Sequence, residues 1–165
     1  MFSDDLRASA QTVIDGCVKR GWMVATAESC TGGLIAACLT DVAGSSAAVD
    51  RGFVTYHNDA KRDLLGVDQA LLDSVGAVSE EAARAMAEGA LKASQAEIAV
   101  SCTGIAGPGG ATPDKPVGLV HVAVAHRGQS TQHQRMEYGD IGRLAVREKT
   151  VRDALGMVLN TMRED

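Results

Sequence analysis

A serine stands at residue 29, between two short apolar segments. Residues 22–27 are apolar or β-branched, which is typical of a buried strand. Leu34, Ala37 and Cys38 then recur at helical spacing. A strand that turns directly into a helix points the unpaired N–H groups of the first turn at whatever lies above the serine, and such a corner can hold a nucleophile together with an oxyanion or a phosphate. A Ser/Thr-rich N-cap followed by a glycine turn fits the same residues, so this stretch alone leaves both interpretations open.

The motif Ser-Cys-Thr-Gly occurs twice, at residues 29–32 and 101–104, and each copy follows an apolar segment. If these segments are neighbouring strands, both glycine-rich corners face one crevice at the carboxyl ends of the strands, where open α/β sheets bind ligands. The second copy continues as a glycine-rich loop to Gly110. That loop has neither the Gly-Lys-Ser/Thr ending of a Walker motif nor a GxGxxG helix opening, so ATP-driven chemistry has no support. Because four residues can match by chance, the shared crevice is a hypothesis.

A serine attacks a carbonyl only with help from a base, either a histidine or a lysine that burial keeps neutral. Lys61 follows the expected strand that ends in Tyr56, and we expect that strand to pair near Ser29, with the phenol able to pass or orient the proton. The pKa of this lysine must then lie well below its usual value of about 10.4. From spacing alone, a solvated lysine paired with Asp59 or Asp63 is the commoner outcome.

Other side chains compete for these roles. His57 is the rival base, but neighbours on a strand point to opposite faces, so it is not expected to face the site together with the preceding tyrosine. Cys30 and Cys102 are rival nucleophiles, although buried thiols at strand ends are more often inert packing. Arg143 and Arg147 stand one helical turn apart, where they either clamp a phosphate or lie on the surface.

The elements that must position these residues alternate in a way that predicts an α/β fold. We expect helices at residues 4–19, 34–40, 58–65, 68–74, 79–92 and 140–162, the last starting near Ile141. We expect strands at residues 22–27, 49–56, 96–102, 117–125 and 131–138, the last two as an antiparallel hairpin. The apolar side of the first helix, which ends at Gly21, comprises Leu6, Val13, Ile14, Cys17 and Val18. No linker divides the chain, so we expect one domain over residues 1–165.

The composition is that of an ordinary globular chain, with 45% hydrophobic and 22% charged residues. A net charge of −5 without a run of Lys or Arg gives no support for binding to nucleic acid. No apolar run approaches the roughly 20 residues that span a bilayer, and residues 1–7 do not resemble a signal peptide. The cysteines and histidines show no metal-ligand spacing, so we expect reduced thiols, no metal, no cofactor and a cytoplasmic location.

Several longer motifs together resemble the CinA C-terminal domain family. They are residues 26–33 (TAESCTGG), 44–46, 51–56 with Asn58 and Lys61, 76–79, 101–107 and 115–118, in a resemblance that runs from about Leu6 to Leu159. It implies a three-layer α/β/α sandwich with a mixed central sheet, commonly assembled as a dimer. Members that stand alone without a molybdopterin-type domain, among which we expect this chain, resemble nicotinamide mononucleotide (NMN) amidohydrolases. These convert NMN to nicotinate mononucleotide and ammonia in bacterial pyridine nucleotide recycling.

The resemblance also implies roles for particular residues. Ser29 would be the nucleophile, with Lys61 and Tyr56 as the activating pair. Backbone N–H groups around Thr31 and Gly32 would hold the oxyanion, and water would hydrolyse the acyl-enzyme after ammonia leaves. The implied substrate-binding residues are Cys30, Thr31, Gly32, Gly33, Gly44, Ser45, Thr103, Gly104, Ala106, Gly107 and Arg147. Residues 139–143 are longer than the family's Gly-Asp-Arg, which leaves the register of the two arginines open.

Two other functions stay open beside the deamidase. One is a non-catalytic nucleotide-binding or regulatory module, and the other is an amidase for a different carboxamide. The joint presence of Ser29, Tyr56 and Lys61 favours the deamidase, because a binding module has no need of a desolvated lysine. The expected partners are a small mononucleotide substrate and a second copy of the chain, with neither nucleic acid nor membrane.

Overall fold

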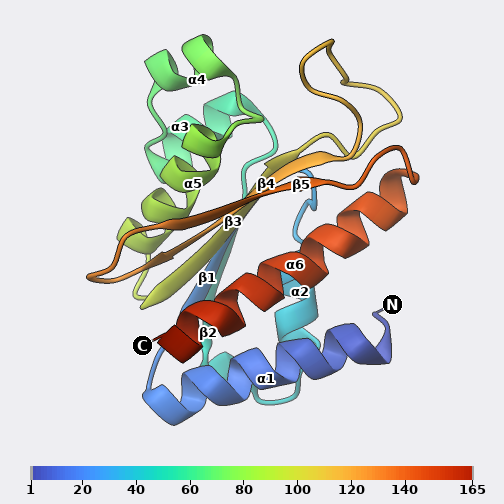
Figure 1. The fold of residues 1–165 in the computed structure, drawn as a ribbon. Helices are drawn as coiled ribbons and strands as arrows, with labels where there is room; N and C mark the ends of the chain where they lie inside the picture. The colour runs from blue at the N-terminus through green and yellow to red at the C-terminus, as the bar shows by residue number, and fades with distance from the viewer. Residues whose placement is uncertain (1, 165) are drawn as a thin grey trace.

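A mixed sheet of five strands in the order β2-β1-β3-β4-β5 forms the middle layer of the protein (Figure 1). The computed structural model describes residues 2–164, so Met1 and Asp165 of the expected domain lie outside the described residues. The strands are β1 (Val24–Glu28), β2 (Val49–Val54), β3 (Ile98–Gly104), β4 (Leu119–His126) and β5 (Gln132–Glu137). β1 pairs in parallel with β2 and β3, whereas β3–β4 and β4–β5 are antiparallel. The expected mixed sheet and its hairpin are confirmed.

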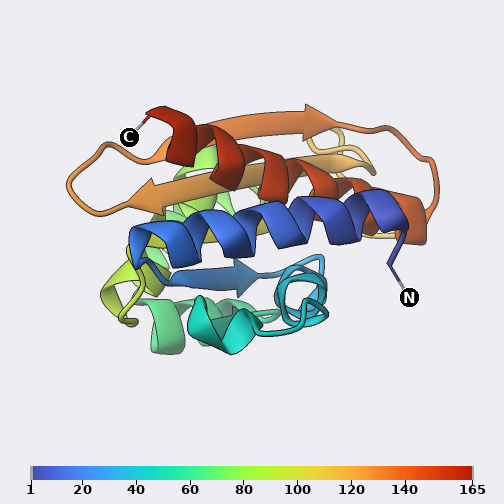
Figure 2. The same cartoon turned by 90° about the horizontal axis from the view of Figure 1, so that it is seen from below.

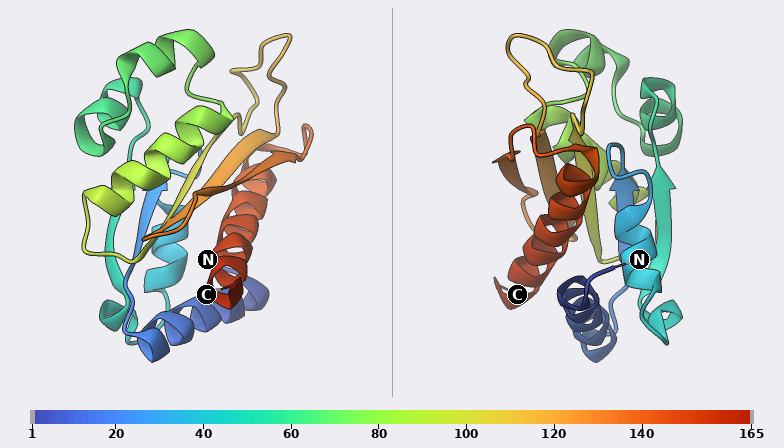
Figure 3. Two further views of the ribbon diagram at one scale, coloured as in Figure 1. Left: turned by 60° about the vertical axis from the view of Figure 1, so that its left-hand side comes forward. Right: turned by 90° about the vertical axis from the view of Figure 1, so that its right-hand side faces the viewer.

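Helices cover both faces of this sheet, which completes the expected three layers (Figures 1 and 3). One face carries α1 (Asp4–Arg20), α2 (Leu34–Thr40) and α6 (Arg143–Glu164); the other carries α3 (Asn58–Leu65), α4 (Gln69–Val75) and α5 (Glu80–Lys92). A 3-10 turn, η1 (Ser45–Ala47), precedes β2. α1 and α6 lie side by side (Figure 2) and bury most of the predicted apolar stripe of α1. Val18 is a correction, because it lies further round the helix than Cys17 and is 52% exposed.

The two faces of the central strands carry side chains of different size. Successive residues of a strand point to opposite faces, so the alternation of Val or Ile with Ala separates the two kinds. The larger side chains, among them Val24, Ile98, Val100, Val120, Val122 and Val124, pack against α1, α2 and α6. The smaller ones are Ala25, Ala27, Ala99, Ala123 and Ala125, and these face the alanine-rich α5. Because the chain has only two Phe and one Trp to fill its core, the core is filled instead by a close approach of α5 to the sheet, which the small alanine side chains allow.

Two glycines in helices lead to opposite predictions for stability. A Cβ added at Gly89 in α5 would overlap the carbonyl oxygen of Leu65, whereas a Cβ at Gly156 in α6 would meet nothing within 4 Å. We expect Gly156→Ala to raise the free energy of unfolding by about 0.5–1 kcal/mol through helix propensity. Gly89→Ala should lower it by about 1–3 kcal/mol because overpacking outweighs that gain. Urea denaturation measures both, and equal shifts would contradict the close packing of α5.

Several strand and helix ends differ from those expected from the sequence. Strand β1 includes Glu28 and β3 extends to Gly104, because the backbone of each still pairs with a neighbouring strand. Strand β2 ends at Val54 rather than at residue 56. Helix α6 begins at Arg143 rather than near residue 141, since Gly142 before it has a φ of 92° that helices do not allow. Local propensity does not predict a glutamate or a glycine inside a strand, which is why Glu28 and Gly104 fall outside the expected strands.

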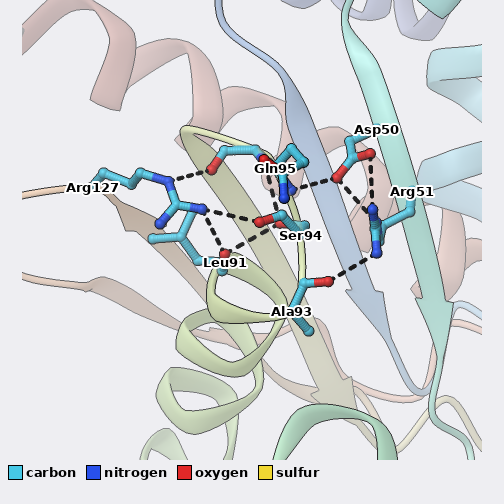
Figure 4. Close-up of polar contacts among 8 residues, drawn as sticks. Asp50, Arg51, Leu91, Ala93, Ser94, Gln95 and Arg127 are labelled. Carbon is cyan, nitrogen blue, oxygen red and sulfur yellow. Dashed lines mark hydrogen bonds and ion pairs between the residues drawn. The ribbon is translucent and has the colours of Figure 1, made fainter.

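The amino ends of the parallel strands are held by polar contacts with the segment between α5 and β3 (Figure 4). Asp50 Oδ2 accepts a hydrogen bond from the Gln95 N–H at 2.7 Å, and Arg51 donates to the Ala93 carbonyl oxygen at 3.0 Å. Arg127, just after β4, donates to the Ser94 and Ala96 carbonyl oxygens of the same segment and to the Leu91 carbonyl oxygen in the last turn of α5. This end of the sheet is therefore closed by short loops, while the opposite, carboxyl ends of β1 and β3 carry the glycine-rich corners.

Candidate active site

Ser29 directly follows β1 at the wall of a cavity of about 260 Å³. Its N–H donates to the Cys102 carbonyl oxygen at 3.0 Å, which extends the pairing of β1 with β3 by one residue. Gly32 and Gly33 follow with φ values of 60° and 100°, a region that glycine adopts without steric strain. The chain thus turns from strand to helix within a few residues and leaves the half-buried serine at the turn.

Lys61 is the base candidate that the structure brings to this serine. Its Nζ lies 3.2 Å from Ser29 Oγ, 2.8 Å from the Thr55 carbonyl oxygen and 3.4 Å from the Tyr56 carbonyl oxygen. The residue is 1% exposed, and this burial lowers the pKa of Lys61 from its usual value of 10.5. A lysine amine with a lowered pKa therefore lies within hydrogen-bond distance of a serine hydroxyl.

The alternative of a solvated lysine is excluded by how α3 is oriented. Lys61 and Leu65, four residues apart, form the buried side of this helix. Arg62 lies on the exposed side and makes ion pairs with Asp59 at 3.2 Å and with Asp63 at 2.9 Å. The two carboxylates considered as partners for the lysine are thus paired with its neighbour. Helix α3 begins at Asn58 because the His57 imidazole caps it by accepting a hydrogen bond from the Asp59 N–H.

Tyr56 lines the same cavity, but its hydroxyl has a different partner from the one expected. The phenol oxygen accepts a hydrogen bond from Arg143 Nη2 at 2.9 Å, and the residue is 60% exposed. Only the backbone carbonyl of Tyr56 meets the lysine. Since Lys61 reaches Ser29 directly, the geometry needs no phenol between them, and the activating role of Tyr56 stays a prediction.

The rival catalytic groups are placed less favourably. Cys30 lies at the cavity wall, but its pKa is raised because its thiol donates to Cys102 and is buried. Cys102 itself is completely buried in β3. His57 caps α3, with Nδ1 accepting from the Asp59 N–H at 3.3 Å, and its side chain is 80% exposed. Serine is therefore the nucleophile that this geometry favours.

About half of the predicted site residues line the cavity. They are Ser29, Cys30, Tyr56, Lys61, Thr103, Gly104, Ala106 and Gly107. The cavity is also lined by residues outside the predicted set, which are Asn58, Ala77, Val78, Gly109 and Gly110. Ile105, within the loop 103–107 that the resemblance places at the pocket, and Arg143, one of the two arginines considered for a phosphate, line it too. Thr103 Oγ1 donates to the Ala77 carbonyl oxygen and Lys115 Nζ to the Val75 carbonyl oxygen. These bonds bring the segment after α4 beside the loop that follows β3 (Figure 3), a proximity that no local pattern signals.

The two Ser-Cys-Thr-Gly copies lie at the same end of neighbouring parallel strands, as expected, but they are not equivalent. The register places Glu28 opposite Cys102, so Ser101 is still inside β3. It is fully buried and donates to the Ala83 carbonyl oxygen of α5 at 2.6 Å. The offset of two residues thus makes one serine a candidate nucleophile and the other a packing contact.

The corner after Ser29 turns some predicted groups inward, which corrects their expected places. The Thr31 side chain is buried and donates to Glu28 Oε2 at 2.5 Å. The Gly32 N–H donates to the Ser29 carbonyl oxygen at 3.0 Å, and the Gly33 N–H donates to Glu28 Oε2. Within residues 2–164, the N–H groups of residues 30 and 31 donate to no other residue, and that of Cys30 interacts only with its own thiol. These two are therefore the candidates for holding an oxyanion.

Gly44 and Ser45 do not line the cavity, contrary to expectation. They lie between α2 and β2, and the Val24 N–H at the start of β1 donates to the nearby Ala48 carbonyl oxygen at 2.7 Å. Because β1 and β2 are parallel, α2 must run back along the sheet before β2 begins. The turn is consequently at the end of the sheet opposite Ser29.

Arg143, rather than Arg147, lines the cavity. Arg143 Nη1 donates to the Gly107 carbonyl oxygen at 2.9 Å. Arg147 Nη2 donates to the Thr31 carbonyl oxygen at 2.8 Å, and its Nε is buried without a hydrogen-bond partner among the described residues. The α6 register therefore brings the first of the two arginines to the pocket, while the second supports the corner from behind.

Three further findings concern the whole described chain. All four cysteines are buried with free thiols. Among residues 2–164, no group of three or more His, Cys, Asp or Glu side chains is placed to hold a metal ion. In that same range, no helix has both the length and the apolar character needed to cross a bilayer.

Comparison with known proteins places these features in a family. A model of the CinA C-terminal domain matches residues 6–162. A putative competence-damage inducible protein of Caldicellulosiruptor saccharolyticus is 44% identical over 98% of this chain, which spans 39% of that protein's length. A protein of Enterobacter agglomerans named nicotinamide-nucleotide amidohydrolase PncC is 59% identical over 61% of this chain and 62% of its own length. The crystal structure of competence/damage inducible protein CihA from Agrobacterium tumefaciens superposes with a TM-score of 0.96 at 55% identity, covering 99% of this chain and 98% of that chain.

Proposed function

The chain belongs to the CinA C-terminal domain family, and on that premise we propose that it hydrolyses the carboxamide of NMN to nicotinate mononucleotide and ammonia. The observation that carries this proposal is the contact of 3.2 Å between a buried lysine Nζ and Ser29 Oγ at a cavity wall. The similarity to a protein named nicotinamide-nucleotide amidohydrolase supports the choice of substrate. We further propose that the chain acts as a homodimer on cytoplasmic NMN in pyridine nucleotide recycling.

The first half of the proposed reaction forms an acyl-enzyme. The neutral Lys61 amine takes the proton of the Ser29 hydroxyl while Oγ bonds to the carboxamide carbon. The carbonyl oxygen becomes an oxyanion, for which the N–H groups of Cys30 and Thr31 are the donors that bind no other described residue. When the C–N bond breaks, the lysine returns the proton to the leaving nitrogen, and ammonia departs.

The second half repeats these roles with water. The lysine amine takes a proton from a water molecule, whose oxygen bonds to the acyl carbon and re-forms an oxyanion. Collapse breaks the bond to Ser29 Oγ, and Lys61 returns a proton to that oxygen. The carboxylic acid product leaves and gives its proton to solvent to become the carboxylate, and the free serine is restored. One buried amine thus serves both steps, which is why its lowered pKa matters at neutral pH.

Arg143 is the cation that we propose for the phosphate of the mononucleotide, since it is the arginine at the cavity wall. A guanidinium–phosphate contact contributes roughly 1.5–3 kcal/mol, so Arg143→Gln should raise KM for NMN about 10- to 100-fold and change kcat little. The residual turnover of nicotinamide riboside, which has no phosphate, should not respond to this substitution. Arg152→Gln is the matched control, because Arg152 lies on the same helix and contacts Asp5 instead. An equal loss with both substrates would assign Arg143 a structural role.

Ammonia release from NMN, nicotinamide riboside and nicotinamide tests the proposed function directly. We expect turnover of NMN, little or no turnover of the other two compounds, and no ammonia release by the Ser29→Ala variant. Turnover of the riboside as fast as that of NMN would mean that the phosphate is not read. If the folded chain released no ammonia from any of the three, the deamidase would be excluded and the non-catalytic binding module would remain.

A further inference from the structure

Glu28, the last residue of β1, is completely buried, and its carboxylate accepts five hydrogen bonds. Oε1 accepts from Thr26 Oγ1 at 3.2 Å and from the Ala36 N–H at 2.8 Å. Oε2 accepts from Thr31 Oγ1 at 2.5 Å and from the N–H groups of Gly33 at 3.1 Å and Ile35 at 2.9 Å. All five neighbours donate, which fits an acceptor-only carboxylate.

These donors surround the catalytic corner on both sides. Four of them belong to the turn and to the first turn of α2, so the carboxylate ties the helix start to the strand end; these are Thr31, Gly33, Ile35 and Ala36. The N-cap of α2 is Gly33, which has no side chain to cap the helix. The glutamate of the preceding strand takes over that task. The candidate oxyanion donors at residues 30 and 31 lie within the loop that it closes.

The backbone of Glu28 also connects the nucleophile to the base. Its carbonyl oxygen accepts from the Thr55 N–H at 2.8 Å, and the Thr55 carbonyl oxygen accepts from Lys61 Nζ at 2.8 Å. Ser29 is the next residue in the chain. A displacement of this strand end would therefore move Oγ and Nζ relative to each other, and catalysis is sensitive to shifts of this kind.

We propose that Glu28 is a positioning residue for the hydrolysis, whose carboxylate fixes Ser29 and the corner N–H groups against Lys61. The proposal rests on the proposed function. Glu28 touches neither substrate nor reacting atoms and acts through the corner that it holds. A glutamine at this position would place an N–H₂ group against backbone N–H donors, which would lose the Ala36 bond if it replaced Oε1 or the Gly33 and Ile35 bonds if it replaced Oε2.

The test compares Glu28→Gln with Val13→Ala, a substitution in the buried core between α1 and the sheet. We expect Glu28→Gln to lower kcat about 10²-fold, with KM within about threefold of the natural value. Val13→Ala should lower the melting temperature by a similar amount but leave kcat unchanged. Thr26→Val removes only one of the five bonds, so it should fold even if Glu28→Gln does not. It should lower kcat about three- to tenfold at constant KM.

A second measurement keeps this proposal separate from the choice of substrate. The rate at which a fluorophosphonate labels Ser29, followed by mass spectrometry, reports the reactivity of the serine without any carboxamide. We expect Glu28→Gln to slow this labelling at least about tenfold. Slow labelling together with no ammonia release from the natural chain would support the positioning role and exclude the substrate. Unchanged kcat and labelling in both Glu28→Gln and Thr26→Val, or a loss no larger than that of Val13→Ala, would overturn the proposal.

Discussion

Replacing Ser29 by alanine should lower the rate of ammonia release from NMN by at least about 10⁴-fold, because no other group at the corner can form the acyl-enzyme. Cys30 is the nearest alternative, and its raised pKa keeps it a thiol rather than the reactive thiolate. The cavity wall loses a single oxygen atom in this variant. Substrate affinity should therefore stay within about threefold, which separates loss of chemistry from loss of binding.

Ser101→Ala is the matched control for Ser29→Ala. It removes the same hydroxyl from the second copy of the motif, where the serine is buried against α5 and outside the cavity. We expect full activity and a loss of about 1 kcal/mol in the free energy of unfolding. Coupled ammonia detection measures the activity of both variants, calorimetric titration with NMN measures the affinity of Ser29→Ala, and urea denaturation measures the stability of Ser101→Ala. If Ser29→Ala kept more than a tenth of the natural rate, a different nucleophile or direct attack by water would be indicated.

Much of the fold follows from the sequence because its signals are local. Apolar segments of strand length alternate with amphipathic segments, and glycines such as Gly21 and Gly66 end helices in the left-handed region. The parallel pairing of the two glycine-rich corners follows from the general geometry of α/β sheets. What the sequence could not show is register. A shift of two residues between the corners decides that Ser101 packs against α5 while Ser29 faces the cavity.

The candidate site was predictable only in part for a related reason. Lys61 follows Ser29 by 32 residues, and no local pattern shows that α3 turns it inward while Arg62 takes the aspartates. The family resemblance implied the correct lysine, but it also implied that Gly44 lies in the pocket. That residue follows α2, which runs to the other end of the sheet. Glu28 looks like an ordinary charged residue, and its five bonds exist only once the corner is folded.

Replacing Lys61 should be nearly as damaging as replacing the serine, with a loss of activity of about 10³-fold or more in both Lys61→Met and Lys61→Arg. Methionine removes the base and keeps the volume. Arginine keeps a positive charge but stays protonated at all accessible pH values, so it cannot accept the serine proton. Activity in the arginine variant would show that charge, rather than proton transfer, is what Lys61 supplies. In the natural chain, kcat/KM should rise with pH as Lys61 loses its proton and then level off.

The stability of Lys61→Met gives an independent test, because the burial that makes the lysine a base also destabilises the fold. Below the usual lysine pKa of about 10.4 the unfolded chain holds a proton at this position. The folded chain does not hold it until the pH falls below the lowered pKa of Lys61. Between these two values the unfolded state binds more protons, so the natural chain loses stability as the pH falls. Methionine does not titrate, and the melting temperature of Lys61→Met relative to the natural chain should therefore rise from pH 10 towards pH 7. A difference that stayed constant over this range would mean that Lys61 is protonated in the folded chain and cannot act as the base.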